Sequence, residues 1–342
     1  MSSFYRQVFK SMAGVHPEHR FVFIAEKHAD STGKQPSNVQ TARLPPTAAN
    51  YLLRRFRDEF KLSSLLKKYN ADVFVSTNGN RFLKTGIPQC IILINGGTGK
   101  RRLSKLLNKA SLVVTSSVVQ QQKIEELYKI SPRKTVVIHP AASSFFKPVL
   151  QEQREKIKEK YCEGKEYFFC KVIDDQVVLI NLLKAFSQFK KMQKSGMKFL
   201  FATNFSGKAS SFMQSFATYK YREDVILLNN LSEEETALIT ASAYAAVIPF
   251  SNEETMITVL EALQSGVPAI VSENAAVKEI TGEASLYSDI TNPKDTGEKL
   301  MRIYIDENLR TQLAERGKQV APSYSSQKTA ELLLQAILQV VK

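Results

Sequence analysis

The sequence contains no tryptophan, and its 342 residues include only three cysteines and four histidines. Cys90, Cys162 and Cys170 are dispersed along the chain, so they form neither a metal-binding spacing nor a disulfide framework. An odd number of scattered cysteines is typical of a reducing compartment, and we expect a cytoplasmic protein. The sequence also contains no zinc-finger or RNA-recognition motif, which makes nucleic acid the weakest candidate partner.

Long hydrophobic runs are also missing. No apolar stretch approaches the ~20 residues that a membrane-spanning helix needs. The first ten residues, MSSFYRQVFK, match neither a signal peptide nor a lipidation motif. A hydrophobic fraction of 43% and a charged fraction of 23% are ordinary for a globular protein. A chain of this length favours two domains over one.

Acidic residues are absent from Val73 to Ile124, although the net charge of the whole chain is +14. The basic residues of this span are Arg81, Lys84, Lys100, Arg101, Arg102, Lys105, Lys109 and Lys123. A basic surface suits an anionic membrane, a phosphorylated substrate or a nucleic acid, and a solvated helix face is the simpler alternative. The span therefore predicts, as one option, peripheral binding at the inner membrane face.

Short apolar runs alternate with helix-like segments through most of the chain, as in RFVFIAE, ADVFVST, QCIILIN and ASLVVTSS. Continuous apolar strands between helices predict parallel sheets that are covered on both faces. A charged stretch, QEQREKIKEKY, follows Pro148, and the alternation then starts again. We predict an α/β fold with two Rossmann-like domains that face a cleft, residues 1–149 and 150–323. Residues 324–342 are predicted to form a helix that returns towards the first domain.

Two glutamates, Glu253 and Glu261, are eight residues apart in the stretch NEETMITVLEALQSGVPAIVS. Helix signals place a helix from near Thr255 to just before Gly266. Glu253 then lies at the N-terminal end of the helix, where the helix dipole tolerates a carboxylate, and Glu261 lies about two turns further on. For two glutamates alone, the simpler interpretation is a capping residue and a solvated side chain.

Short motifs surround this pair in a fixed order. They are Pro249, Leu260-Glu261-Ala262, Ser265-Gly266-Val267-Pro268, Glu279-Ile280, Gly282, Ala284, Asn292-Pro293, Glu315-Arg316-Gly317, Tyr324-Ser325 and Lys328-Thr329-Ala330. The series resembles the C-terminal domain of the retaining GT-B glycosyltransferases of family 4. The resemblance is strong from about Tyr221 onward and weaker before it.

The resemblance implies a donor site in the second domain. At the position of Glu261, the family binds the ribose diol of the donor nucleotide, because a carboxylate accepts two hydrogen bonds. Glu253 would face the donor sugar as a catalytic and donor-binding residue. The helix start, with Thr255, Met256 and Ile257, would offer backbone amides to the donor phosphates. The nucleotide sugar is a co-substrate, and no cofactor or metal ion is implied, in line with the absence of an Asp-x-Asp motif.

Several positions depart from the family pattern. The Arg and Lys that neutralise the departing diphosphate correspond to Gln176 and Val177, and Lys171 stands at a glycine position. The Gly-Phe-Gly after the first glutamate is replaced by Glu254-Thr255-Met256. Asn95, followed by Gly96, stands in place of a His-Asp pair and is kept as a candidate catalytic residue. These departures predict a degenerate donor-phosphate site.

The family's first strand and its glycine loop have no counterpart before Phe4. We therefore expect the N-terminal domain to lack its first strand, either because the start codon lies upstream or because part of the acceptor site is missing.

Two functions follow from these observations. One is a retaining, metal-independent glycosyltransferase that moves a sugar from a nucleotide-sugar donor to a glycan or lipid-linked acceptor. The other is a catalytically degenerate relative that acts as a binding or partner protein. Nucleotide binding and turnover would discriminate between them.

Overall fold

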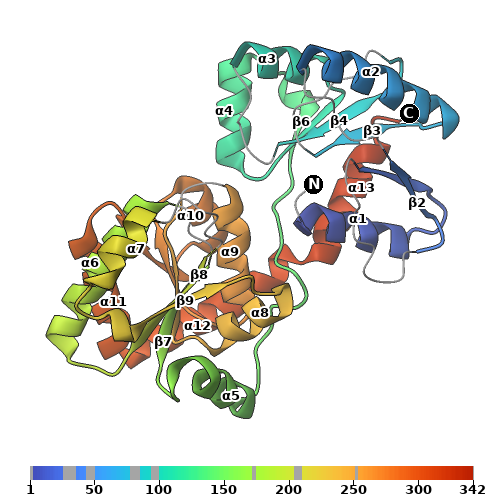
Figure 1. Cartoon of the computed structure of the whole chain (residues 1–342). Helices are drawn as coiled ribbons and strands as arrows, with labels where there is room; N and C mark the ends of the chain where they lie inside the picture. Colours follow the sequence, from blue (N-terminus) through green and yellow to red (C-terminus); the bar gives the residue numbers. More distant parts are fainter. Residues whose placement is uncertain are drawn as a thin grey trace. The chain divides into compact units, whose positions relative to one another are not determined.

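The computed structural model describes residues 3–25, 36–43, 51–77, 85–93, 100–171, 175–203, 210–250 and 253–341. Contacts divide the chain into two compact units (Figure 1). Unit 1 consists of residues 1–140 and 326–342, and unit 2 consists of residues 141–325. Every pair of neighbouring strands is parallel in the part of the chain that the structure describes. The predicted α/β fold with parallel sheets is confirmed.

Unit 1 alternates helices and strands along its first 140 residues. Its elements are α1 (Ser3–Val15), β1 (Phe21–Ala25), β2 (Val39–Arg43), α2 (Tyr51–Lys68), β3 (Phe74–Ser76), β4 (Gln89–Ile92), α3 (Lys100–Lys109), β5 (Leu112–Thr115), α4 (Val118–Tyr128), the 3-10 helix η1 (Pro132–Lys134), β6 (Thr135–Val137) and α13 (Ser326–Leu338). The described strands form two parallel sheets, in the orders β1-β2 and β3-β4-β5-β6. That the N-terminal domain lacks the first strand of the family stays a prediction.

The chain returns to unit 1 through α13, which packs against α1. The hydroxyl of Thr329 donates to the carbonyl oxygen of His139 at 3.1 Å. One face of α1 is apolar and buried through Phe4, Val8 and Met12, because apolar residues three and four apart share one side of a helix.

Unit 2 is a parallel β-sheet with helices on both faces. Its elements are α5 (Gln151–Cys162), β7 (Tyr167–Lys171), α6 (Gln176–Gln193), β8 (Lys198–Thr203), α7 (Ser210–Ala217), η2 (Arg222–Asp224), β9 (Val225–Asn229), α8 (Glu233–Ser242), β10 (Ala245–Ile248), α9 (Glu253–Gln264), β11 (Ala269–Ser272), α10 (Ala275–Thr281), β12 (Ser285–Ser288), α11 (Pro293–Ile305), α12 (Glu307–Val320) and η3 (Ala321–Tyr324).

The six-stranded sheet of unit 2 has the order β12-β11-β10-β7-β8-β9. The chain starts at β7 in the middle, moves outward through β8 and β9, and then restarts on the other side at β10. The direction of winding therefore reverses between β7 and β10. In open parallel sheets, ligands bind beyond the carboxyl ends of the strands at this reversal, so the sheet order alone locates a candidate site.

Both faces of this sheet are buried, which explains the continuous apolar strands. Successive side chains of a strand point to opposite faces. Phe168 and Cys170 of β7 belong to the hydrophobic cluster under α6, α7, α11 and α12. Tyr167 and Phe169 belong to the cluster under α8, α9 and α10. Lys171 follows in the second series and therefore projects towards α9.

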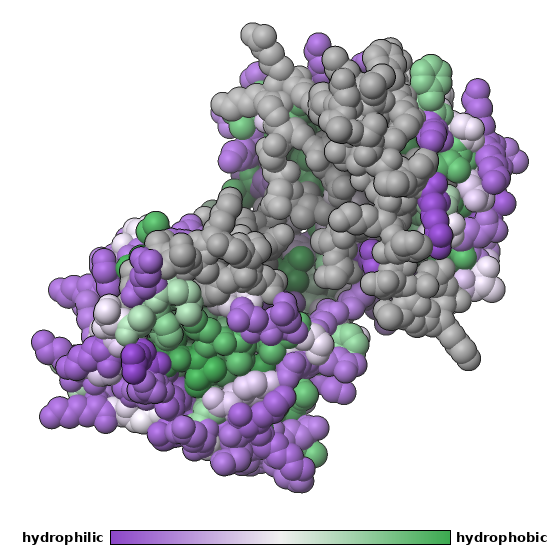
Figure 2. Space-filling model, in the orientation of Figure 1, coloured by the Kyte–Doolittle hydropathy of each residue, from purple (hydrophilic) through white to green (hydrophobic). Residues whose placement is uncertain are grey.

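The surface of unit 2 is mostly hydrophilic on the face drawn in Figure 2. A patch of hydrophobic side chains lies over the edge strand β9 (Figures 1 and 2), whose Ile226, Leu227 and Leu228 are partly buried. None of the helices, as far as the structure describes them, combines the length and apolar character that crossing a membrane requires.

Candidate functional site

The helix α9 carries the glutamate pair and begins at Glu253, two residues before the predicted start. It ends at Gln264 because Gly266 adopts a left-handed conformation with φ of +72°. The amide of Gly266 donates to the carbonyl of Leu263, and the amide of Val267 donates to that of Ala262, both at 3.0 Å. This Schellman motif explains the glycine, and the proline that follows starts the path into β11.

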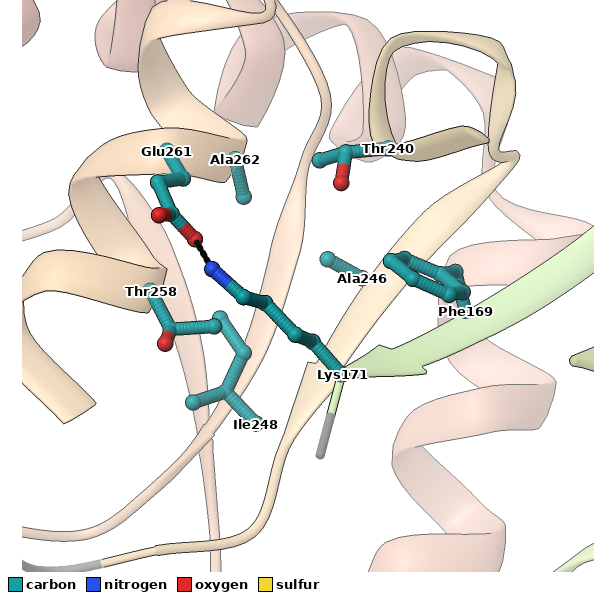
Figure 3. Close-up of a pocket in the computed structure, with 8 residues that line it drawn as sticks. All are labelled: Phe169, Lys171, Thr240, Ala246, Ile248, Thr258, Glu261 and Ala262. Carbon is teal, nitrogen blue, oxygen red and sulfur yellow. Dashed lines mark hydrogen bonds and ion pairs between the residues drawn. The ribbon is translucent and has the colours of Figure 1, made fainter. Parts of the chain in front are cut away.

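Glu261 is buried rather than solvated, with 6% of its side chain exposed. Its Oε2 accepts a hydrogen bond from Nζ of Lys171 at 2.5 Å (Figure 3). The two residues line one pocket, together with Phe169, Thr240, Ala246, Ile248, Thr258 and Ala262. Lys171 ends β7 and Ile248 ends β10, so the pocket lies at the reversal point of the sheet.

Lys171 crosses this pocket from the strand to the helix (Figure 3). A quarter of its side chain is exposed, and its ammonium lies 5.2 Å from the ring centroid of the fully buried Phe146. Gln264, one turn beyond Glu261, donates to the carbonyl oxygens of Ser143 and Phe146 at 3.1 and 2.6 Å. The same helix therefore holds the carboxylate and the segment that places the aromatic ring.

The start of α6 is the second element of interest. The carboxylate of Asp175 accepts hydrogen bonds from the amides of Val177 and Val178 at 2.9 and 3.3 Å. It thus caps the helix with its own negative charge, at a place where a helix terminus could otherwise hold an external anion. The side chain of Gln176 is partly buried, and that of Val177 is 66% exposed.

The other predicted site residues fall into two groups. Thr255 and Met256 are buried and Ile257 is partly buried in the first turns of α9, where Met256 belongs to the core. Glu253 is the first residue of α9, but its side chain lies outside the described part of the structure. Asn95 lies entirely outside the described residues.

Sequence reasoning missed the pairing of Lys171 with Glu261 and the roles of Phe146 and Gln264. The spacing of Gln264, three residues after Glu261 on one helix face, was the available signal. Among the residues that the structure describes, no group of three or more His, Cys, Asp or Glu side chains is arranged to hold a metal ion.

The pKa of Glu261 is raised above its ordinary value of 4.5 because burial disfavours the charged form. The ammonium of Lys171 lowers this pKa and the carboxylate of Glu233 raises it, but burial has the larger effect. The folded state therefore binds this proton more tightly than the unfolded state does. It follows that the contribution of Glu261 to stability is greatest below pH 4.5 and is lost as the pH rises through its folded pKa.

A Glu261→Gln variant, which cannot titrate at this position, tests this sign. We expect the melting temperature of the variant, minus that of the wild type, to increase as the pH rises above 4.5. Differential scanning calorimetry at several pH values measures this difference. The pH-dependent contributions of the other carboxylates are the same in both proteins and cancel. A difference that moves in the opposite direction would mean that attraction to Lys171 outweighs burial.

The fold defines a class of protein. The structure superposes on WaaG, described as a glycosyltransferase involved in lipopolysaccharide biosynthesis, with a TM-score of 0.75 and 14% identity over 97% of this chain and 95% of that chain. It also superposes on Alr3699/HepE of Anabaena, solved in complex with UDP and glucose, with a TM-score of 0.77 and 11% identity over 97% and 95% of the two chains. These likenesses show a fold of the GT-B type.

The family follows from the sequence match. Residues 150–320, half of the chain, match the model of the family "Glycosyl transferases group 1", and this chain belongs to that family. The O-antigen chain mannosyltransferase B of Escherichia coli is 22% identical over 229 residues, which make up 66% of this chain. The match spans 60% of that relative's length.

Proposed function

We propose that this protein is a retaining, metal-independent glycosyltransferase that transfers a sugar from a nucleotide-sugar donor to a glycan or lipid-linked acceptor. The observation that carries the proposal is the buried carboxylate of Glu261 in a pocket at the reversal point of the unit 2 sheet, within the span that matches the family. WaaG is described as acting in lipopolysaccharide biosynthesis and the Escherichia coli relative as an O-antigen chain mannosyltransferase, which supports this acceptor class.

We assign the following donor-binding roles to residues of this chain. Glu261 accepts hydrogen bonds from the vicinal hydroxyls of the donor ribose, because a carboxylate offers two acceptor oxygens. The first amides of α9 face the donor phosphates, where the helix dipole favours negative charge. Glu253, at the start of the same helix, faces the transferred sugar.

Nucleotide binding is the first test. A nucleoside diphosphate should raise the melting temperature, because a ligand that binds only the folded state stabilises it by ~2.7 kcal/mol at a hundredfold excess over Kd. We expect Glu261→Gln to reduce this shift strongly and Glu261→Ala to abolish it, as measured by thermal melts with millimolar UDP, GDP or ADP.

Gln335→Ala in α13 is a suitable control, since this exposed position belongs to unit 1, and its melting shift should equal that of the wild type. A wild-type protein that no nucleotide stabilises at millimolar concentration would contradict the proposed donor site.

A specific observation favours a second candidate function, that of a degenerate relative which binds a partner without transferring sugar. Lys171 already neutralises Glu261, and Asp175 already caps α6. Two of the groups that could recognise a donor, the Glu261 carboxylate and the N-terminus of α6, therefore already have partners within the chain. Nucleotide binding without release of sugar from any nucleotide-sugar donor would support this candidate over the transferase.

The basic span of unit 1 supports a peripheral membrane role. The helix α3 buries Leu103 and Leu107 and exposes Lys105 and Lys109, so its basic side faces outward. Near an anionic lipid surface, each Lys or Arg contributes ~1 kcal/mol. We expect binding to vesicles that contain anionic lipid to weaken at least a hundredfold when four basic residues become Gln, namely Lys100, Arg101, Arg102 and Lys105.

Vesicle co-sedimentation at low salt measures this effect. A matched control neutralises four exposed lysines of unit 2 and should bind nearly as the wild type does: Lys147, Lys184, Lys191 and Lys220. Equal loss in both quadruple variants would point to net charge rather than to α3, and unchanged binding of the α3 variant would refute a membrane role for this helix.

A further inference from the structure

The ion pair in the pocket of unit 2 joins residues that are ninety positions apart, Lys171 and Glu261. Both side chains line the pocket, so the ion pair lies inside it. Figure 3 shows the Lys171 chain passing between the strand end and α9, with its ammonium directed at the carboxylate. The carboxylate oxygen that would receive a ligand hydroxyl thus already has a donor, and the stem of Lys171 fills part of the space in front of it.

We infer that Lys171 is an internal competitor of the donor ribose, so that a nucleotide occupies the pocket only when the ammonium leaves Glu261. The inference rests on the proposed function, because it names the residue that sets nucleotide affinity at the same site. Lys171 acts here as a specificity-determining residue and not as a catalytic one.

The exchange has a chemical requirement. Glu261 is buried, and a buried carboxylate without a hydrogen-bond donor is costly. A ligand that displaces Lys171 must therefore replace its hydrogen bond, and a vicinal diol brings two hydroxyl donors to the two carboxylate oxygens. The ammonium itself can move into water, since a quarter of the Lys171 side chain is already exposed.

The exchange also predicts selectivity. A ligand that lacks the vicinal hydroxyls cannot satisfy Glu261 and so cannot displace Lys171 at a comparable concentration. A site that hydrogen-bonds a substrate hydroxyl strongly rejects the analogue without it, because its own buried polar group is then left unpaired. The Lys171–Glu261 pair would thus select nucleotides that carry both ribose hydroxyls.

Isothermal titration calorimetry of the whole chain with UDP, GDP and ADP tests the inference. In Lys171→Ala the competitor is absent, and we expect the Kd of the preferred nucleotide to fall at least tenfold. The corresponding 2′,3′-dideoxynucleotide should show no gain. The double variant Lys171→Ala/Glu261→Ala is the matched control, because it opens the same space without the carboxylate, and it should also show no gain.

Removal of Lys171 could impair folding, since it leaves Glu261 buried without its partner. Lys171→Gln keeps a neutral hydrogen-bond donor and is expected to give a smaller gain in affinity in the same direction. Far-UV circular dichroism and thermal melts of each variant confirm that binding is measured on folded protein.

The outcomes separate the two proposals. A tenfold or larger gain that depends on both the diol and Glu261 supports the inference. Binding by the Lys171 variants alone also supports it, but contradicts the proposed transfer reaction of the wild-type chain. Binding by the wild type with equal or weaker binding by Lys171→Ala and Lys171→Gln overturns the inference and leaves the proposed function intact. Absence of nucleotide binding in the wild type and in every folded variant overturns both.

Discussion

A variant with Gln176→Arg and Val177→Lys is expected to raise kcat for sugar transfer by ~10²-fold or more. The reason is electrostatic: a preorganised group that stabilises developing charge contributes ~10²–10³ in rate. These two residues begin α6, where Val177 is 66% exposed and Gln176 is partly buried, so neither belongs to the buried face of the helix. Release of nucleoside diphosphate from a nucleotide-sugar donor measures the effect.

A control variant places one Lys and one Arg at the far end of α6. Met192 is 65% exposed and Gln193 is the last residue of the helix, so Met192→Lys with Gln193→Arg adds equal charge away from the pocket. Turnover of this control should stay near that of the wild type. Should both double variants behave alike, the positions of Gln176 and Val177 would not be those of a phosphate clamp.

Phe199→Ala should lower the free energy of unfolding of unit 2 by ~3–5 kcal/mol, the usual cost of removing a buried aromatic ring. Phe199 is fully buried on β8, and its ring lies 5.4 Å from that of Phe186 and 4.2 Å from that of Phe201. The chain has no tryptophan, so urea unfolding is best followed by far-UV circular dichroism.

Phe60→Ala is the matched control for this prediction. Phe60 lies on α2 of unit 1 with 74% of its surface exposed, and exposed substitutions usually change stability by less than ~0.5 kcal/mol. The two units can unfold in separate transitions, and only the transition of unit 2 should move in Phe199→Ala. A shift of similar size in both variants would contradict the assignment of Phe199 to the core.

Much of the fold was predictable because strands covered on both faces are continuously apolar. Such continuously apolar runs indicate six of the strands, namely β4, β5, β7, β8, β10 and β11. β2 (Val39–Arg43) does not carry this signal, since only Val39 and Ala42 of its five residues are buried. α12 carries little signal for a similar reason, because Leu313 and Gly317 are its only buried residues, and a mostly solvated helix has little hydrophobic pattern.

The candidate site was predictable in its position but not in its internal pairing. The helix signals in the sequence placed Glu261 on a helix, and α9 contains it. The ion pair joins Lys171 at the end of β7 to Glu261 in the last turn of α9. Only the folded sheet brings these two elements together. A sequence gives the residue type at position 171 but not the direction in which its side chain extends.

The division of the chain into units has a consequence for its synthesis. Unit 1 is built from residues 1–140 and 326–342, so all of unit 2 leaves the ribosome before α13 is available to pack on α1. Until then α1, with its apolar residues Phe4, Val8 and Met12, lacks the helix that packs against it, which favours binding by chaperones or aggregation. Unit 2 is contiguous and can fold first, which makes the unit that contains the N-terminal residues the later of the two to mature.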